Sequence, residues 1–142
     1  MVKTSNLLLP WEKLAQEGKL AEAVIEYVKG YDYVSLAELT RNLQPYMETK
    51  GDFIWRIDGN VLLWANASFE FLDLITSLVD SGQLYLEPCP PLVYFIDGLA
   101  LTFPVAKKPP AKGYKTPHWL PVCLRVAGKN VKGGQKSCQK AS

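Results

Sequence analysis

Apolar residues recur at helical spacing in three segments of the chain. Residues 19–29 carry them on one side at the 3.6-residue period of an α-helix, and residues 36–43 repeat the pattern. Residues 67–80 are apolar around most of the helical circumference, which is typical of a central helix. A shorter helix is expected from Pro10, because proline suits a first helical turn, and Gly18 should end it.

Polar residues at the segment boundaries predict where the helices begin and end. Ser35 followed by Glu38 is a capping box, in which each side chain bonds the backbone N–H of the other residue. Asn66 is expected to cap the helix at residues 67–80, and Gly82 to follow its end.

Segments of β-prone residues account for the other expected elements. Asp58–Gly59 and Asp97–Gly98 each join two such segments, and Asp-Gly indicates a hairpin because a type I′ turn needs positive φ at both central residues. The predicted hairpins are residues 52–57 with 60–65 and residues 92–96 with 99–103. Single strands are expected at residues 31–34, 83–87 and 119–126.

In chain order these elements resemble a winged helix-turn-helix domain, in which three helices precede a β-hairpin wing. The likeness rests on residues 20–29 as the first helix, 33–39 as a strand leading into the second, 69–80 as the third and 83–103 as the wing. The chain departs from the family by a hairpin inserted before the third helix. The resemblance implies an α+β fold, a modified winged-helix-like core of about three helices with two β-hairpins, here followed by a basic, proline-rich C-terminal extension.

The third helix carries the wrong charge for reading DNA, the role that it often has in the family. Between residues 67 and 82 the chain has Glu70, Asp73 and Asp80 and no Lys or Arg. A helix in the major groove passes between phosphates and reads bases through Arg, Lys, Asn or Gln. We therefore expect this helix to be core, and the body of the domain to be a scaffold or a protein-binding surface.

Charge divides the chain into two parts. Residues 1–103 hold 7 basic and 14 acidic residues, a net charge of −7, whereas residues 104–142 hold 9 basic residues and no acid. We expect a domain at residues 1–103, a basic proline-rich segment at 104–127 that packs on the domain or extends from it, and a disordered basic tail at 128–142.

The basic segment is a candidate nucleic-acid arm. Its cations would neutralise phosphates without reading sequence, and its aromatic side chains would stack on unpaired bases. The alternative is that residues 104–127 strap across the acidic body, because residues 119–126 have the apolar density of a strand. The residues assigned to the nucleic-acid site are Lys107, Lys108, Lys112, Tyr114, Lys115, His118, Trp119 and Arg125.

Catalytic and metal-binding patterns are weak. His118 is the chain's one histidine, nothing in the sequence places Cys89 or Cys123 beside it, and no Walker or dinucleotide phosphate loop occurs. Glu70 and Asp73 share a helix face, which without histidine or a second acidic motif indicates a solvated surface. We expect no enzymatic activity, no cofactor and no metal site, and the three cysteines to be free thiols.

These features favour one function and leave a second open. No apolar run approaches the ~20 residues of a membrane helix and no secretory signal is evident, so a cytoplasmic protein without membrane attachment is expected. We predict a non-enzymatic, nucleic-acid-associated regulatory protein that binds through the basic segment without strong sequence readout. The alternative is a protein–protein interaction or assembly module with a protein partner or as a homodimer. An exposed apolar patch around Trp55 and Trp64 would favour that alternative.

Overall fold

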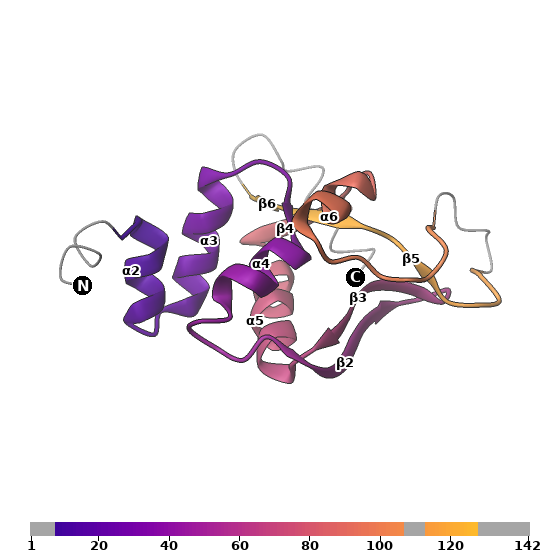
Figure 1. Cartoon of the computed structure of the whole chain (residues 1–142), viewed down its shortest axis with the longest axis horizontal. Coiled ribbons are helices and arrows are strands. Elements are labelled where there is room, and N and C mark those ends of the chain that lie inside the picture. Colours follow the sequence, from indigo (N-terminus) through magenta and orange to yellow (C-terminus); the bar gives the residue numbers. More distant parts are fainter. Residues whose placement is uncertain (1–7, 107–112, 128–142) are drawn as a thin grey trace.

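The computed structural model describes residues 8–106 and 113–127, which form a mixed α+β structure of five helices and two small sheets (Figure 1). None of the helices in these two ranges is long and apolar enough to span a membrane. The helices are α2 (Pro10–Gln16), α3 (Leu20–Gly30), α4 (Leu36–Leu43), α5 (Phe69–Asp80) and α6 (Leu92–Asp97). The strands are β1 (Val34–Ser35), β2 (Lys50–Ile57), β3 (Val61–Ala67), β4 (Leu84–Pro88), β5 (His118–Trp119) and β6 (Val122–Val126).

The first sheet has the order β1-β6-β4, so its central strand comes from the C-terminal part of the chain. Both pairings are antiparallel, with Val34 opposite Leu124 and Leu84 opposite Val126. Leu124 is fully buried, because α3 and α4 contact β6 while α5 contacts β4. Residues 122–124 are therefore part of the core of the domain.

The second sheet has the order β2-β3-β5 and extends away from the helices (Figure 1). The predicted hairpin at residues 52–65 is confirmed, and β5 adds to it parallel to β3. The turn of this hairpin differs from the expected type I′ turn. Positive φ occurs at Gly59 and Asn60, with values of 84° and 61°, and not at Asp58. The turn therefore has three residues between the paired positions 57 and 61.

Two glycines close the tip of this sheet against the segment that leads into β5. A side chain on Gly113 would lie 2.3 Å from the Cα of Gly59, and Gly113 has a φ of 79°. The backbone N–H of Tyr114 donates to the carbonyl of Gly59 at 2.8 Å, and the Asn60 side chain donates to the carbonyl of Tyr114 at 2.9 Å. Residues 113–114 are thus fixed to the hairpin, which only glycine at both close positions permits.

The expected helices at residues 19–29, 36–43 and 67–80 are confirmed, with the last beginning two residues later than predicted. On α5, Phe71, Leu72, Ile75, Leu78 and Val79 are buried, as expected for a central helix. Trp55 and Trp64 are also buried, at 9% and 4% exposure, so neither side chain belongs to an exposed apolar patch.

The predicted hairpin at residues 92–103 is wrong. Residues 92–97 form α6, Gly98 caps it in the left-handed conformation with a φ of 87°, and no strand lies at residues 99–103. The strand expected at residues 83–87 is formed as β4, which pairs with β6. A left-handed glycine ends a helix as readily as it turns a hairpin, so Asp97–Gly98 did not distinguish the two structures.

The helix caps differ from the prediction at α5 and agree with it at α4. Ser68, not Asn66, caps α5, and its side chain accepts from a first-turn N–H at 3.0 Å; Asn66 lies in β3 with a φ of 55°. Ser35 caps α4 as predicted and accepts from the N–H of Glu38 at 3.0 Å. The Glu38 carboxylate accepts a hydrogen bond from the hydroxyl of Tyr27 on α3, and the backbone N–H of Ser35 also lowers the pKa of this carboxylate, as expected for a capping box.

Candidate protein-docking surface

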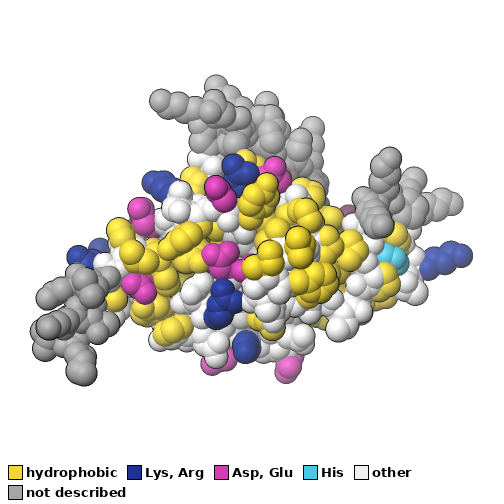
Figure 2. Space-filling view, turned by 45° about the horizontal axis from the view of Figure 1, so that its top comes forward, with side chains coloured by type: hydrophobic (Ala, Val, Ile, Leu, Met, Phe, Trp, Pro, Cys, Tyr) yellow, Lys and Arg dark blue, Asp and Glu magenta, His cyan; other side chains and the backbone are white. Residues whose placement is uncertain are grey.

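Large apolar side chains are exposed on α6 and on the segment that follows it. Leu92 and Phe95 are each 63% exposed, and Ile96 is 76% exposed. Leu99 and Phe103 continue the group at 39% and 37%. In the space-filling view hydrophobic side chains gather over the part of the molecule that contains α6 (Figure 2). We call these five residues the α6 surface.

The opposite side of α6 is held in the core by Tyr94. This side chain is fully buried, with its ring 5.4 Å from that of Trp64 and 5.1 Å from that of Trp119. Its hydroxyl donates to the carbonyl of Val122 at 2.6 Å and accepts from the N–H of Leu36 at 3.1 Å. Burial raises the pKa of Tyr94 well above its ordinary value, so the hydroxyl keeps its proton and its donor role. One side of α6 is therefore anchored while the other is exposed.

The C-terminal end of α6 is fixed to α4 and β1. The carboxylate of Asp97 accepts from the Ser35 hydroxyl at 2.5 Å, and the backbone carbonyl of Asp97 accepts from the Arg41 guanidinium at 2.5 Å. The N–H of Gly98 donates to the carbonyls of Tyr94 and Phe95. These bonds hold α6 in one position, so the exposed side chains belong to a rigid element.

Two adjoining hollows border the α6 surface at Leu99. Each has a volume of about 210 Å³. Both are lined by Thr40, Lys50 and Leu99. The first hollow continues to Arg41, Gln44, Asp97 and Gly98; the second continues to Trp64, Ala65, Asn66, Ala100 and Leu101. An apolar surface next to hollows lined by both apolar and polar residues is typical of a site for a partner's side chains.

The charges along these hollows favour an acidic partner. Arg41 donates to a backbone carbonyl, and neither Arg41 nor Lys50 forms an ion pair within the described ranges. The carboxylate of Asp97, in contrast, is hydrogen-bonded by Ser35. Arg41 and Lys50 are therefore exposed cations outside the ion pairs of the described residues, with Asp97 lining one hollow and the half-buried Glu38 near Arg41.

A second group of exposed apolar side chains lies at the junction of β2 and α5. Phe53 and Ile54 are 52% and 47% exposed, and Phe69 is 59% exposed. The rings of Phe53 and Phe69 contact each other with a centroid distance of 5.8 Å. This group is smaller than the α6 surface, and none of its residues lines either hollow.

The residues assigned to a nucleic-acid arm have different positions in the structure. Lys107, Lys108 and Lys112 lie outside the described residues. The Tyr114 ring stacks on the His118 ring at 3.7 Å with an interplanar angle of 11°, and Lys115 between them in sequence is exposed. The stacked pair occupies the tip of the second sheet, where Tyr114 bonds the turn of the hairpin.

Trp119 and Arg125 are engaged with the rest of the domain. Trp119 is 1% exposed, and β5 and an isolated bridge to Val105 hold its backbone. The guanidinium of Arg125 pairs with the carboxylate of Glu87 at 2.8 Å, where both side chains are about half exposed. The nucleic-acid role of this segment stays a prediction; among its described members Lys115 and Arg125 are exposed, and Tyr114 and His118 are half-buried.

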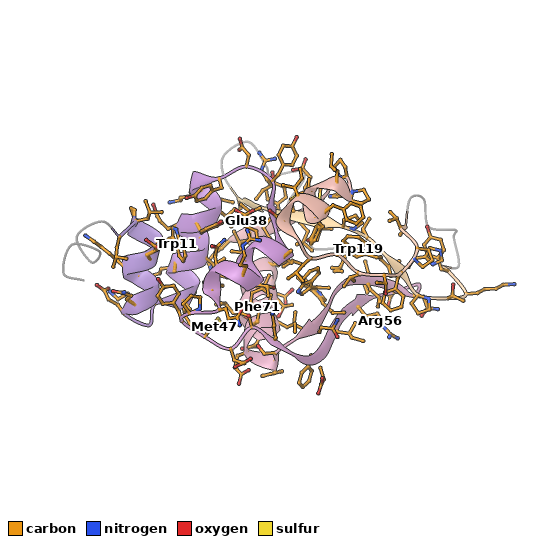
Figure 3. All side chains as sticks on the ribbon, viewed as in Figure 1. Trp11, Glu38, Met47, Arg56, Phe71 and Trp119 are labelled. Atoms are coloured by element: carbon orange, nitrogen blue, oxygen red, sulfur yellow. The ribbon has the colours of Figure 1, made fainter. Side chains whose placement is uncertain are left out.

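The most perturbed carboxyl group of the domain is Glu38, which lies between α3 and α4 (Figure 3). Burial raises its pKa, and the hydrogen bond from Tyr27 opposes the rise. Burial and the same bond raise the pKa of Tyr27. The Asn42 side chain donates to the Tyr27 hydroxyl at 3.0 Å. These contacts join α3 to α4, and α4 in turn contacts α6.

The described residues contain no group of three or more His, Cys, Asp or Glu side chains arranged to hold a metal ion. The chain matches no family model, and no curated protein or solved structure is detectably similar to it. Its function therefore has to be argued from the surfaces themselves.

Sequence reasoning missed the α6 surface because residues 92–96 were assigned to a strand. The signal was present. Leu92, Phe95, Ile96 and Leu99 recur at positions i, i+3, i+4 and i+7, which is the spacing of one helix face. Pro91 at the N-cap of the helix was a further indication.

Proposed function

We propose that the chain is a non-catalytic protein-interaction module whose α6 surface binds an apolar segment of a partner protein with acidic flanking residues. The observation that carries this proposal is the exposure of five large apolar side chains on and after an anchored helix. Contiguous exposed apolar groups mark interaction sites on proteins, and burial of apolar area contributes roughly 25 cal/mol per Å². The unpaired cations Arg41 and Lys50 support the acidic character of the partner, because complementary charges orient association.

The core of this module is, in our proposal, a modified winged helix. Its support is the order α3, β1, α4, α5, β4 and β6, with β4 and β6 as the antiparallel pair that follows the third helix. The connection between those two strands contains α6, so the proposed docking helix occupies the place of a wing turn. Winged helices also serve as protein–protein modules, and α5 exposes Glu70, Asp73 and Asp80 without a cation.

Selection from a displayed library of random peptides tests the docking proposal. The α6 variant Phe95→Ser/Ile96→Ser and the control Phe53→Ser/Ile54→Ser change the same residue pair at two exposed places. We expect enriched peptides to combine apolar residues with Asp or Glu. Their affinity, measured by fluorescence anisotropy, should fall at least about tenfold in the α6 variant and by less than about twofold in the control.

Three results would overturn this proposal. The library yields no shared apolar and acidic motif, the α6 variant binds as well as the control, or binding is insensitive to Arg41→Ala and Lys50→Ala. Analytical ultracentrifugation of the parent distinguishes one further case. Concentration-dependent dimers that the α6 variant abolishes and the control retains would make this surface a homodimer interface, and the heterologous partner would be rejected.

Nucleic-acid binding through residues 104–142 is the second candidate function. It is favoured by the net charge of +9 in this part of the chain and by the stack of Tyr114 on His118 beside Lys115. Anisotropy of labelled duplex and single-stranded oligonucleotides over a salt series tests it. Micromolar affinity with a steep salt dependence that weakens in Lys107/Lys108/Lys112/Lys115→Ala is expected. Absence of binding at low salt from the folded chain would reject this function.

A further inference from the structure

Two cysteines lie on the same face of the first sheet. Glu87 pairs with Cys123 across β4 and β6, and the N–H of Cys89 donates to the carbonyl of Pro121 at 3.0 Å, which continues the ladder by two residues. Side chains two residues apart on a strand share a face. Cys89 and Cys123 are therefore diagonal neighbours across the strand pair.

The two thiols differ in exposure and acidity. Cys89 is partly exposed, whereas Cys123 is 1% exposed. The hydrogen bond from Cys123 lowers the pKa of Cys89, although burial and the carboxylates Glu87 and Asp97 oppose this effect. The same contact and burial raise the pKa of Cys123. Thiolate is the nucleophile in thiol chemistry, so an attacking group at the surface stands beside a protected second thiol.

We propose that Cys89 and Cys123 form a thiol–disulfide exchange site for low-molecular-weight disulfides, with Cys89 as the attacking thiol and Cys123 as the resolving thiol. This site is independent of the docking function proposed above. It rests on the sheet register, which places the two residues on one face of adjacent strands, and on the unequal exposure of the two cysteines.

The reaction balances in two displacements. The Cys89 thiolate attacks one sulfur of the small disulfide, forms a mixed disulfide and releases one thiolate, which takes up a proton. The Cys123 thiol then loses its proton and attacks the Cys89 sulfur, which releases the second thiolate. The protein dithiol is oxidised by two electrons to the Cys89–Cys123 disulfide, and the small disulfide is reduced to two thiols.

The bond formed would cross-link β4 to β6 immediately before Pro90, Pro91 and α6. Cys89 already bonds Pro121, the residue before β6, through its backbone, so the new link adds a side-chain constraint to an existing contact. The reaction would thus leave the sheet in place and restrain the start of α6.

Mass spectrometry of the full chain with oxidised glutathione as the probe tests this proposal. A Cys138→Ser background, in which Cys89 and Cys123 are the two cysteines, serves as the parent. We expect the parent to lose two hydrogens and to retain no glutathione. Cys123→Ala should accumulate one glutathione on Cys89, and Cys89→Ala should react at least about tenfold more slowly than Cys123→Ala.

The difference in reaction rate between Cys123→Ala and Cys89→Ala tests the assignment of the attacking and resolving thiols. Equal rates for both variants, or a parent that stops at the mixed disulfide, would overturn the assignment of roles. A parent that does not react would overturn the site itself. Should Cys123→Ala fail to fold, brief alkylation of the parent gives the same comparison, since Cys89 must be modified before Cys123.

Discussion

In α5, Phe71 and Ile75 are fully buried, whereas in α6 Phe95 and Ile96 are 63% and 76% exposed. Both helices are rich in large apolar side chains, and both have rigid positions. α5 is packed between α3 and β4, while α6 touches the core on the Tyr94 side. Apolar content alone therefore does not determine whether the side chains of a helix are buried in the core or exposed for binding a partner. The residue that anchors the helix decides which side chains remain for a partner.

Truncating the same residue type in both helices gives the largest expected contrast. Phe71→Ala should reduce the free energy of unfolding by about 3–5 kcal/mol, because it removes a buried ring and leaves a cavity. Phe95→Ala should change it by less than about 0.5 kcal/mol, because that ring is in water already. Urea unfolding followed by tryptophan fluorescence measures both. Similar losses from the two variants would show that α6 is part of the core.

Removing the anchor hydroxyl of α6 should have the next largest effect. Tyr94→Phe leaves the N–H of Leu36 and the carbonyl of Val122 buried without that partner. The expected loss in the free energy of unfolding is about 1–3 kcal/mol. Tyr33→Phe, at a side chain that is 62% exposed, is the control and should be neutral. An equally neutral Tyr94→Phe would mean that α6 is held by packing of its ring alone.

The caps of the two helices also differ, and this predicts a smaller effect. Ser68 caps α5 through its side chain and also donates to the carbonyl of Glu48 at 2.7 Å, whereas Pro91 at the N-cap of α6 has no such bond. Ser68→Ala should cost about 1 kcal/mol of stability in thermal or urea unfolding. Ser77→Ala, at an exposed position inside α5, is the control and should leave the free energy of unfolding unchanged. If Ser68→Ala leaves the free energy of unfolding unchanged, packing rather than the serine cap determines where α5 begins.

The smallest effect concerns α4, on which α6 rests, and it depends on pH. Burial raises the pKa of folded Glu38 above its ordinary value of 4.5. Its contribution to stability is therefore complete below about that pH and is lost as the pH rises through the folded pKa. Glu38→Gln keeps an acceptor for the Tyr27 hydroxyl but does not titrate. The free energy of unfolding of this variant should therefore increase relative to that of the parent as the pH rises from about 4.5.

Urea unfolding of parent and Glu38→Gln at several pH values measures this difference. Glu22→Gln, at an exposed position on α3, is the matched control. A parent that gains stability relative to Glu38→Gln with rising pH would contradict the expected sign, and would mean that the hydrogen bond from Tyr27 outweighs the burial of the carboxylate.

Local sequence patterns predicted the elements whose signals are local. The helices at residues 36–43 and 69–80 and the hairpin at 52–65 follow from periodicity, a capping serine and an Asp-Gly turn. The same dipeptide at residues 97–98 gave the wrong structure, since Gly98 adopts the left-handed conformation at a helix end. Helical spacing from Leu92 to Leu99 carried the correct signal over a longer window.

The pairing of β6 and the α6 surface could not be read from local patterns. Val34 pairs with Leu124 through contacts that join distant parts of the chain, and no periodicity specifies which strand lies between β1 and β4. The exposure of Phe95 depends on the burial of Tyr94 between Trp64 and Trp119. These three aromatic residues come from three separate elements, α6, β3 and β5. Such properties arise from tertiary packing, which local propensity does not contain.

The central position of β6 has a consequence for synthesis of the protein. Ribosomes make β1 and β4 before β6, and these two strands are not bonded to each other in the finished sheet. Until residues 122–126 emerge, both strands present unpaired edges, which other chains can bind. The pairing then spans about 90 residues between Val34 and Leu124, a separation that slows folding. The nascent chain should therefore depend on chaperones up to that point and become independent of them once β6 is inserted.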